Sequence, residues 1–578
     1  MLTSTLSPFS QSGRAAPHSS SHLLLMRLLL AAALALSLAA CGGRDALSDT
    51  QATATSGGAE AVLDLDVDTS TDTSLDAAVD AIMAASYADN TQSAVPETTY
   101  RVRGAQGGQA GTGSFGGFVA AQQQALPLQV TQALAAAHVP EGAVAMLVAP
   151  LPAAGEPLAP LLAWRADASM LPASVMKLVT TYAGLDTLGP SHLWRTRIYT
   201  QGRVVDGVLH GNLVIRGSGD PKLVIERLAD LLASVQAKGV RHITGDIVLD
   251  RSIFKLPAHN AAAFDGEALR PYNVGPDGLL LNFKAMELEL VPHANGLIYV
   301  TDKAPLAGVA VPETVPAARG GCGDWKTRLG AHFDGPGQLS FGGGFSPSCG
   351  AKTLTLAYAD PDSFAPRMIE QAWRAAGGQL GGSVHWVTGG TLKGLRPLVT
   401  GISLPLASII TDINQFSNNV MAQQLFLTLS AQGGKRGSFA ASRSFVGQWW
   451  QRHFGADAAA PVMENGSGLS RRERISAASL VALLAHAAHS PHAQTFANSL
   501  SVAGVSGTAK TMKTRSPGSV ALGRVQMKTG TLRDVVAVAG YAHGMSGRTY
   551  AVAGIVNHAN AGSARPALDR LLEWAVMQ

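Results

Sequence analysis

A serine and a lysine three residues apart, Ser174 and Lys177, are the residues of this sequence best suited to nucleophilic chemistry. Residues at positions i and i+3 share one face of a helix. A serine hydroxyl is a weak nucleophile unless a base beside it takes its proton. An amine can be that base when burial or nearby cations lower its pKa. The pair therefore predicts a serine nucleophile activated by a lysine.

The residues that follow the serine predict the helix that would hold this pair. Apolar residues recur at helical spacing from Met176 to Leu188, and a Gly-Pro pair ends the pattern. A second Ser-x-x-Lys set, Ser252 to Lys255, follows a strand-like run instead. No helix places that serine and lysine on one face, so we interpret the second set as structural.

A polar triplet, Ser417-Asn418-Asn419, supplies a second group of candidates. The triplet sits at the start of a predicted helix that runs through Val420, Ala422 and Leu425, and residues 412–429 as a whole have a helical pattern. Acyl transfer needs a proton relay and a group that orients the base. The Ser417 hydroxyl and the Asn419 amide can fill these two roles, and we assign none to Asn418.

A third motif, the triplet Lys528-Thr529-Gly530, ends a β-rich run and is followed by Thr531. An ammonium group and two hydroxyls can hold a substrate carboxylate, so Lys528, Thr529 and Thr531 are candidate binding residues. Gly530 has no side chain and leaves room for a substrate to lie beside the strand as an added strand. Alone, each triplet is more often a helix cap or a turn.

Taken together and in this order, the Ser-x-x-Lys set and the two triplets, three motifs in all, resemble the signature of penicillin-binding proteins and serine β-lactamases. The chain advances 243 residues from Ser174 to Ser417 and a further 111 to Lys528. The long first interval is similar to that of the D-Ala-D-Ala carboxypeptidase/endopeptidase family, the class C penicillin-binding proteins. Other stretches that resemble this family are Gly217 to Pro221, Gly466 to Arg471 and Gly504 to Thr508.

This resemblance implies an α+β fold. A transpeptidase/β-lactamase-like domain, an antiparallel sheet flanked by helices, would be interrupted by inserted β-rich accessory domains. It implies that Ser174 attacks the carbonyl between two D-alanines, or a D-Ala–diaminopimelate cross-link of peptidoglycan, while Lys177 takes its proton. Ser417, with Lys528 behind it, would return the proton to the leaving group. The backbone N–H groups of Ser174 and Thr531 would form the oxyanion hole, β-lactams would trap the acyl-enzyme, and no cofactor is expected.

The resemblance also implies two residues that hold the diaminopimelate side chain. Arg471 matches by motif, because it follows the Gly-Ser-Gly-Leu-Ser run. Asp265 matches only by its approximate position in the insertion. Arg533 stands where some members carry Gln, which leaves the side-chain preference of this chain open.

Two alternative functions remain. A class A β-lactamase would carry similar triplets, but the long insertion argues against it. A catalytically silent, peptidoglycan-binding envelope protein would be expected to lack Ser174 or Lys177, and both are present. We predict no metal site, because His486, His489 and His492 have no glutamate base or further ligand beside them and fit a helix end.

The first 41 residues have the pattern of an export signal. Arg27 precedes the apolar run 28–38, which is too short to span a bilayer comfortably. Leu38-Ala39-Ala40-Cys41 resembles a bacterial lipobox, and this resemblance implies a lipid on Cys41. Gly42, in place of Asp, favours the outer membrane. We therefore expect a periplasmic lipoprotein, the alternative being an ordinary signal peptide with an incidental cysteine.

The chain of 578 residues exceeds what one hydrophobic core normally serves, so several domains are expected. Strand patterns near both ends of the folded part predict one sheet built from both chain ends. A net charge of +4 and the absence of a dense basic patch with aromatics argue against a nucleic-acid partner. The expected parts are a signal peptide (1–41), a disordered tether (42–125), a transpeptidase-like domain in two pieces (126–193 and 407–578) and accessory domains between them (194–406).

Two cysteines remain once Cys41 is set aside. An even pair in an exported chain indicates a disulfide, because the periplasm is oxidising. Cys322 and Cys349 would then close a glycine-rich loop. The alternative is two unpaired thiols, which only geometry can distinguish.

Overall fold

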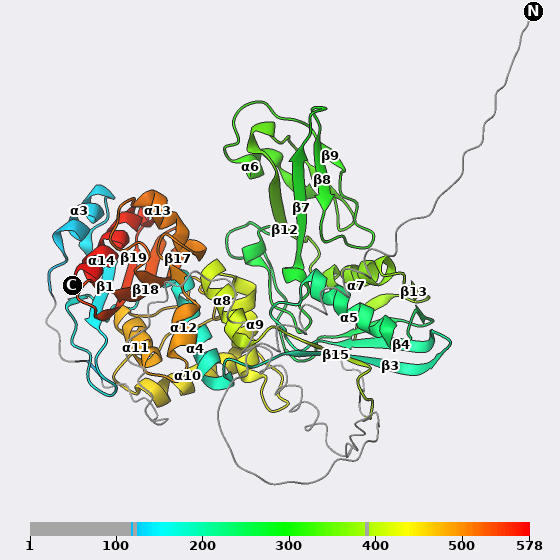
Figure 1. The fold of residues 1–578 in the computed structure, drawn as a ribbon, viewed down its shortest axis with the longest axis horizontal. Coiled ribbons are helices and arrows are strands. Elements are labelled where there is room, and N and C mark those ends of the chain that lie inside the picture. The colour runs from blue at the N-terminus through cyan, green and yellow to red at the C-terminus, as the bar shows by residue number, and fades with distance from the viewer. Residues whose placement is uncertain (1–116, 119–123, 388–391, 393) are drawn as a thin grey trace, which may run out of the picture. The chain divides into compact units, whose positions relative to one another are not determined.

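The computed structural model describes residues 117–118, 124–387, 392 and 394–578 (Figure 1). The expected signal peptide, Cys41 and nearly all of the expected tether lie outside the described residues. Within the described part, no helix is long and apolar enough to cross a membrane.

A six-stranded antiparallel sheet takes strands from both ends of the folded part (Figure 1). Its order is β16-β17-β18-β19-β1-β2, and β1 pairs with β19 in the register Val144 opposite Val556. The prediction of one sheet built from both chain ends is therefore confirmed. The strands are β1 (Val144–Pro150), β2 (Leu162–Trp164), β16 (Ser501–Val502), β17 (Val525–Leu532), β18 (Val535–His543) and β19 (Thr549–Asn557).

Helices cover both faces of this sheet. Side chains along a strand alternate between the two faces, so one strand contributes residues to two hydrophobic cores. In β1, Ala145 and Leu147 belong to one core, whereas Val144 and Met146 belong to the other. This explains why β1 is apolar at successive positions. The second core includes α3 (Leu128–Ala136) and α14 (Arg565–Met577), and the first includes α4 (Lys177–Leu188), α8 (Leu406–Phe416), α9 (Asn419–Ser430), α10 (Phe439–Phe454), α11 (Ala477–Ala488) and α12 (Ala493–Asn498).

The helix expected after the serine begins slightly later than the sequence pattern suggested. Ser174 lies in a 3-10 turn (Ala173–Met176), and Lys177 is the first residue of α4. Ala173 has a φ of 47°, in the left-handed region that residues with a Cβ rarely adopt. Gly189, with a φ of 79°, ends α4 where the Gly-Pro pair predicted an end.

The helix predicted to start at the Ser417-Asn418-Asn419 triplet is confirmed, but the helical segment expected over residues 412–429 is divided between two helices. α8 ends at Phe416 and α9 begins at Asn419. Ser417 has a φ of 59°, and one left-handed residue is enough to end a helix. The Asn418 side chain then caps α9 by accepting the backbone N–H of Met421 at 3.0 Å.

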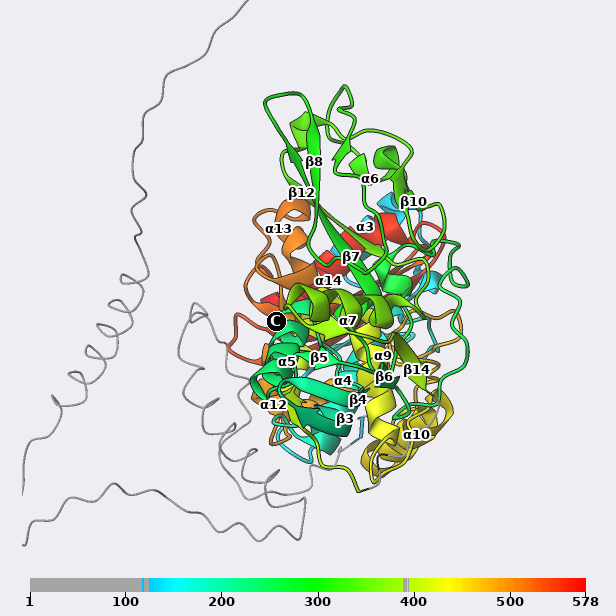
Figure 2. The ribbon, with the colours of Figure 1, turned by 90° about the vertical axis from the view of Figure 1, so that its right-hand side faces the viewer.

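The insertion between α4 and α8 has sheets of its own, as the fold prediction required (Figure 2). The helices α5 (Ile225–Ala237) and α7 (Phe364–Ala375) share a core with the larger sheet. That sheet contains β3 (Arg195–Val205), β4 (Val208–Arg216), β5 (His242–Ile243), β6 (Ile247–Asp250), β13 (Gln379–Leu380), β14 (Val384–Val387) and β15 (Val399–Ile402).

A four-stranded sheet forms the other main part of the insertion, and its core includes the predicted disulfide. Cys322 and Cys349 are bonded, as expected from the even pair of cysteines. The strands are β7 (Ala285–Pro292), β8 (Ile298–Asp302), β9 (Thr314–Val315) and β12 (Lys352–Ala357), with α6 (Trp325–Leu329) and the small pair β10 (Ala331–Phe333) and β11 (Leu339–Phe341) beside them.

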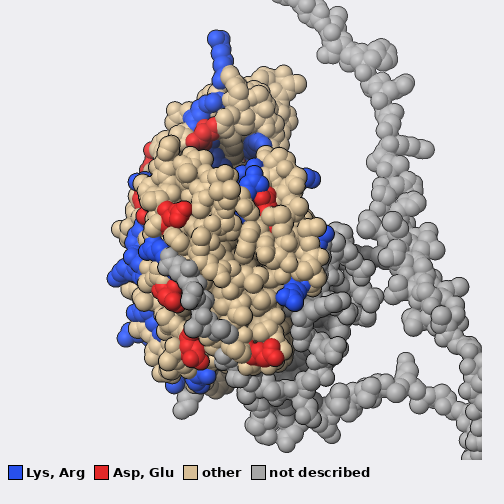
Figure 3. Space-filling view, turned by 90° about the vertical axis from the view of Figure 1, so that its left-hand side faces the viewer, with Lys and Arg blue, Asp and Glu red and all other residues tan. Residues whose placement is uncertain are grey.

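Charged side chains are scattered on the face of the molecule drawn in Figure 3. Lysines and arginines are interspersed with acidic residues and separated by uncharged surface. No large field of one sign covers this face, in keeping with the small net charge of the chain.

Candidate active site

Ser174, Lys177 and Asn419 form one hydrogen-bonded group. The Nζ atom of Lys177 lies 2.9 Å from Ser174 Oγ and 2.6 Å from Asn419 Oδ1. It also lies 2.5 Å from the backbone carbonyl oxygen of Ser467. The fold thus brings together a serine and a lysine of the first motif and an asparagine of the second, as the sequence predicted.

Burial gives Lys177 the character of a base. Its side chain is 0% exposed. Loss of hydration lowers the pKa of Lys177 well below its usual range, and the charge of Lys528 lowers it further, while Glu473 opposes the shift. A neutral amine has a lone pair with which it can accept the serine proton.

Two glycines allow the chain to approach the serine closely. A Cβ atom on Gly530 would lie 3.2 Å from the backbone nitrogen of Ser174 and 2.7 Å from the carbonyl oxygen of Pro172. A Cβ atom on Gly468 would lie 1.9 Å from the carbonyl oxygen of Ala173. Strand β17 and the Gly466–Arg471 stretch therefore pack directly on the turn that carries Ser174.

The third motif contacts the second through Lys528, a buried lysine. Lys528 Nζ donates to Ser417 Oγ at 3.0 Å and to the backbone carbonyl oxygen of Thr529 at 2.8 Å. Burial lowers the pKa of Lys528 to about 7. A group with this pKa changes charge near neutral pH, which suits it to both proton transfer and carboxylate binding.

The hydroxyls beside this lysine have different surroundings. Thr529 Oγ1 is 2.7 Å from Thr508 Oγ1, which comes from the third stretch noted in the sequence. Thr531 is exposed, and its Oγ1 accepts a hydrogen bond from Arg565 at 3.2 Å. Only Thr531 among these hydroxyls therefore lies fully at the surface.

Asp265 and Arg471 lie on neighbouring segments without a direct bond. Asp265 accepts hydrogen bonds from the Tyr272 hydroxyl at 2.9 Å and from the Asn273 amide at 2.7 Å. The Arg471 guanidinium lies 5.2 Å from the ring centre of Phe264 and forms an ion pair with Asp534. Both side chains already have partners, which a substrate group would have to join or replace.

No sequence pattern predicted a role for Glu473, a carboxylate that is 0% exposed. Its Oε1 accepts the backbone N–H groups of residues 464–466 at 2.9, 2.9 and 3.0 Å, and burial raises its pKa. These bonds shape the loop whose Ser467 carbonyl contacts Lys177. Glu473 stands among three arginines in the sequence, a pattern typical of a solvated surface, so nothing local indicated its burial.

The residues set aside in the sequence lie elsewhere. Lys255 donates its backbone N–H to Gly437 at 2.7 Å and is absent from the Ser174 group. His486 on α11 lies 2.7 Å from the Tyr182 hydroxyl and 3.1 Å from His453. Across the described residues, no three His, Cys, Asp or Glu side chains are arranged to hold a metal ion.

A serine beside a buried lysine, packed against strand β17 of an antiparallel sheet, defines a serine peptidase of the penicillin-binding class. The sequence model of the D-Ala-D-Ala carboxypeptidase 3 (S13) family matches residues 128–575. The chain belongs to this family, as the resemblance of the triplets implied.

Known relatives cover most of the described chain. A D-alanyl-D-alanine carboxypeptidase of an Actinomadura species is 29% identical over 459 residues, which is 75% of this chain and 82% of the relative. The D-alanyl-D-alanine carboxypeptidase DacB of Haemophilus influenzae is 24% identical over 320 residues, 54% of this chain and 65% of the relative.

A solved structure shares the fold. Penicillin-binding protein 4 (dacB) from Haemophilus influenzae is similar with a TM-score of 0.62 at 21% identity, over 78% of this chain and 98% of that protein. A structure of the same protein with a bound β-lactam gives a TM-score of 0.59 and covers 77% of this chain and 100% of that one. The penicillin-binding fold with additional sheet domains is therefore confirmed.

Proposed function

We propose that this chain is a D-Ala-D-Ala carboxypeptidase and D,D-endopeptidase that cleaves peptidoglycan peptides through an acyl-enzyme on Ser174. The observation that carries the proposal is the 2.9 Å contact between Ser174 and the fully buried Lys177. Family membership and the carboxypeptidase relatives support the same reaction.

Acylation begins with the transfer of the Ser174 proton to neutral Lys177. The serine oxygen then attacks the carbonyl carbon on the N-terminal side of the scissile bond. Negative charge develops on the carbonyl oxygen, and the backbone N–H groups of Ser174 and Thr531 stabilise it. Ser417 relays the proton from Lys177 to the leaving amine as the C–N bond breaks. The amine departs as D-alanine or as the amine of a cross-linking diaminopimelate, and Lys177 is neutral again.

Deacylation repeats these steps with water as the nucleophile. Water gives a proton to Lys177 and attacks the ester carbonyl, and the shortened peptide leaves with a new carboxyl group as Ser174 regains its proton. Asn419, whose Oδ1 lies 2.6 Å from Lys177 Nζ, holds the base in place through both halves of the reaction.

Lys528 contributes charge at the other side of the serine. In its protonated form it attracts the terminal carboxylate of a D-Ala-D-Ala peptide, with Thr529 and Thr531 as additional donors. A β-lactam also carries a carboxylate, and its opened ring stays attached to the enzyme after acylation. β-lactams therefore act as covalent inhibitors of this site, and Asp265 and Arg471 contribute to holding a diaminopimelate side chain.

The proposed localisation is the periplasm, with a lipid on Cys41 that anchors the chain to the outer membrane. The support for it is the apolar run 28–38 followed by Leu-Ala-Ala-Cys and Gly42. Metabolic labelling with a radioactive fatty acid tests this part. Label on the wild type and none on Cys41→Ser supports the anchor, and equal labelling of both contradicts it.

The test of the reaction uses a fluorescent penicillin with the wild type and Ser174→Ala. We expect a label that survives denaturation on the wild type alone. Folded wild type without label would contradict the proposal. Digestion of an isolated pentapeptide and of a cross-linked dimer then measures the carboxypeptidase and endopeptidase activities separately.

A further inference from the structure

A cavity of about 490 Å³ lies in the insertion, apart from the residues that surround Ser174. This is within the range of typical small-ligand sites. Four basic side chains line the cavity, against two acidic ones. They are Arg251, Lys255, Lys284 and Arg436, with Asp277 and Asp362.

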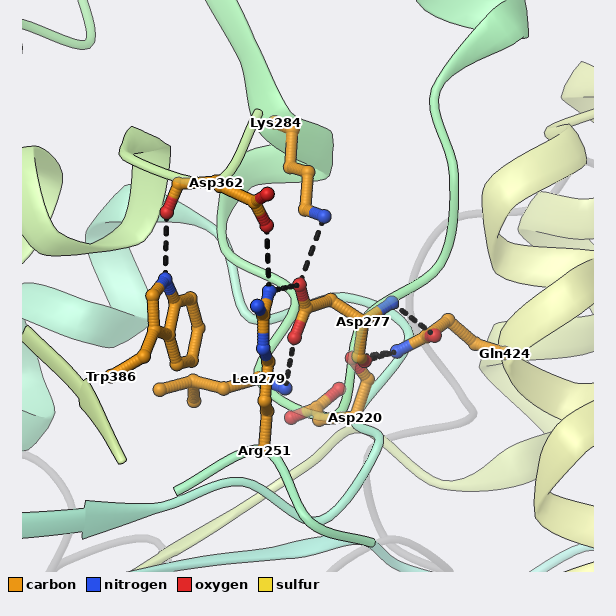
Figure 4. Close-up of polar contacts among 8 residues, drawn as sticks. All are labelled: Asp220, Arg251, Asp277, Leu279, Lys284, Asp362, Trp386 and Gln424. Carbon is orange, nitrogen blue, oxygen red and sulfur yellow. Dashed lines mark hydrogen bonds and ion pairs between the residues drawn. The ribbon is translucent and has the colours of Figure 1, made fainter. Parts of the chain in front are cut away.

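The wall of this cavity is built around a buried carboxylate (Figure 4). Asp277 is 2% exposed and pairs with Lys284 at 2.9 Å and with Arg251 at 3.2 Å. Its backbone N–H donates to Gln424 of α9 at 3.1 Å, and the Arg251 guanidinium lies 4.3 Å from the ring centre of Trp386. These contacts hold the cationic groups in fixed positions.

Several donors in the wall remain available to a ligand. Both ion pairs of Arg251 use Nη1, so its Nε and Nη2 groups are not occupied by them. Arg436 donates to the backbone carbonyl oxygens of Ser252 and Phe254, at 2.8 and 3.1 Å, and has no carboxylate partner within the described chain. The Lys255 ammonium is exposed and has no ion-pair partner among the described residues. The cavity therefore carries positive charge that the protein does not neutralise.

Apolar residues form much of the remaining wall. Phe254, Leu256 and Val387 contribute side chains, and prolines contribute further apolar surface. A small inorganic anion would leave this surface uncovered. A peptide with carboxylates on an aliphatic frame matches both the charge excess and the apolar wall.

One short segment joins the cavity to the candidate active site. The backbone carbonyl of Tyr272 accepts the Asn419 amide at 3.0 Å, and Gly275, three residues further, lines the cavity. Three residues span at most about 11 Å. A ligand in the cavity is therefore within reach of peptidoglycan engaged at Ser174.

We propose that this cavity is a second peptide site, which binds the acidic part of a peptidoglycan stem that is not being cleaved. The choice of stem rests on the proposed function, whereas the charge and shape of the cavity do not. Such a site would bind cross-linked substrate through both of its stems, and would favour cleavage within peptidoglycan over cleavage of isolated peptides.

The experiment titrates an L-Ala-γ-D-Glu-diaminopimelate tripeptide, which contains no D-Ala-D-Ala bond, into the mature full-length protein. Calorimetry is performed on the wild type after saturation with penicillin and on Ser174→Ala. Lys255→Glu is the test variant. Lys238→Glu is its matched control, because this exposed lysine at the end of α5 is outside the cavity lining.

We expect saturable binding to both proteins, weakened at least tenfold by Lys255→Glu and unchanged by Lys238→Glu. A tripeptide with amidated carboxyl groups should also bind at least tenfold more weakly. No saturable binding, or an equal loss with both lysine variants, would overturn the second site. Failure of penicillin to label the wild type would instead overturn the proposed function, and the titration of Ser174→Ala would still report on the cavity.

Discussion

Buried lysines occur both at the candidate active site and in the cavity of the insertion, but their partners differ. Lys177 is fully buried and bonded to neutral oxygen atoms of Ser174, Asn419 and a backbone carbonyl. Lys284 is 7% exposed and lies 2.9 Å from the Asp277 carboxylate. Burial without a bonded carboxylate favours the neutral amine and lowers the pKa of Lys177, whereas Lys284 forms an ion pair with the carboxylate beside it.

This difference in partners separates a lysine with a catalytic role from a lysine with a structural role. A buried lysine without a carboxylate partner can serve as a base, whereas a lysine in an ion pair stabilises a buried carboxylate. The same side chain therefore has two functions, and the group placed beside it decides which.

The largest effect is expected from Lys177→Met. It keeps most of the side-chain volume but removes the base, so the rate of acylation by penicillin should fall by about 10²–10⁴-fold. The measurement is stopped-flow or gel-based acylation with a fluorescent penicillin. A wild-type rate in a folded Lys177→Met variant would mean that another group takes the serine proton.

The same substitution at Lys284 should affect stability instead. Lys284→Met leaves Asp277 with Arg251 as its remaining partner, which we expect to cost about 2–3 kcal/mol in the free energy of unfolding. Denaturant unfolding measures this loss, and the acylation rate below the unfolding transition should stay within about threefold of the wild type. A loss of acylation as large as that of Lys177→Met would remove the contrast between the two sites.

A smaller effect is expected when Glu473 is replaced by Gln. The substitution removes a negative charge that favours protonated Lys177, so the pKa of Lys177 should fall further. The acidic limb of the acylation profile should then move to lower pH by about one unit, because the neutral base persists to lower pH. Glu370→Gln, on α7, is the control with the same charge change, and an identical profile for both variants would show that Glu473 acts only on the loop.

The smallest effect concerns Lys528, whose pKa is lowered to about 7 by burial. A lysine is charged below its pKa, so the attraction for a terminal carboxylate is present below pH 7 and is lost as the pH rises through this value. The KM for a D-Ala-D-Ala peptide should rise by about threefold to tenfold between pH 6 and pH 8. A peptide with an amidated C-terminus should show no such rise, and equal profiles for the two peptides would contradict this role of Lys528.

The sequence by itself determined the chemistry and the general fold. The order and spacing of the three motifs depend only on residue identity, so they predicted the family and the candidate residues. Runs of apolar and β-branched residues near both chain ends predicted the shared sheet, because strand propensity is a local property of the sequence. The disulfide was predicted from the even number of cysteines in a chain that is expected to be exported, and the structure shows it.

The tertiary structure alone decided the contacts that give these residues their environment. Lys177 meets Asn419 across 242 residues of sequence, and Glu473 is buried although its neighbours in sequence are arginines. The left-handed Ser417 interrupts a segment whose apolar pattern continues through it. Desolvation, ion pairing and cavity shape depend on which distant segments pack together, and no local pattern encodes that packing. For this reason the sequence predicted Lys177 as a base, whereas only the fold revealed Lys284 beside the buried carboxylate of Asp277.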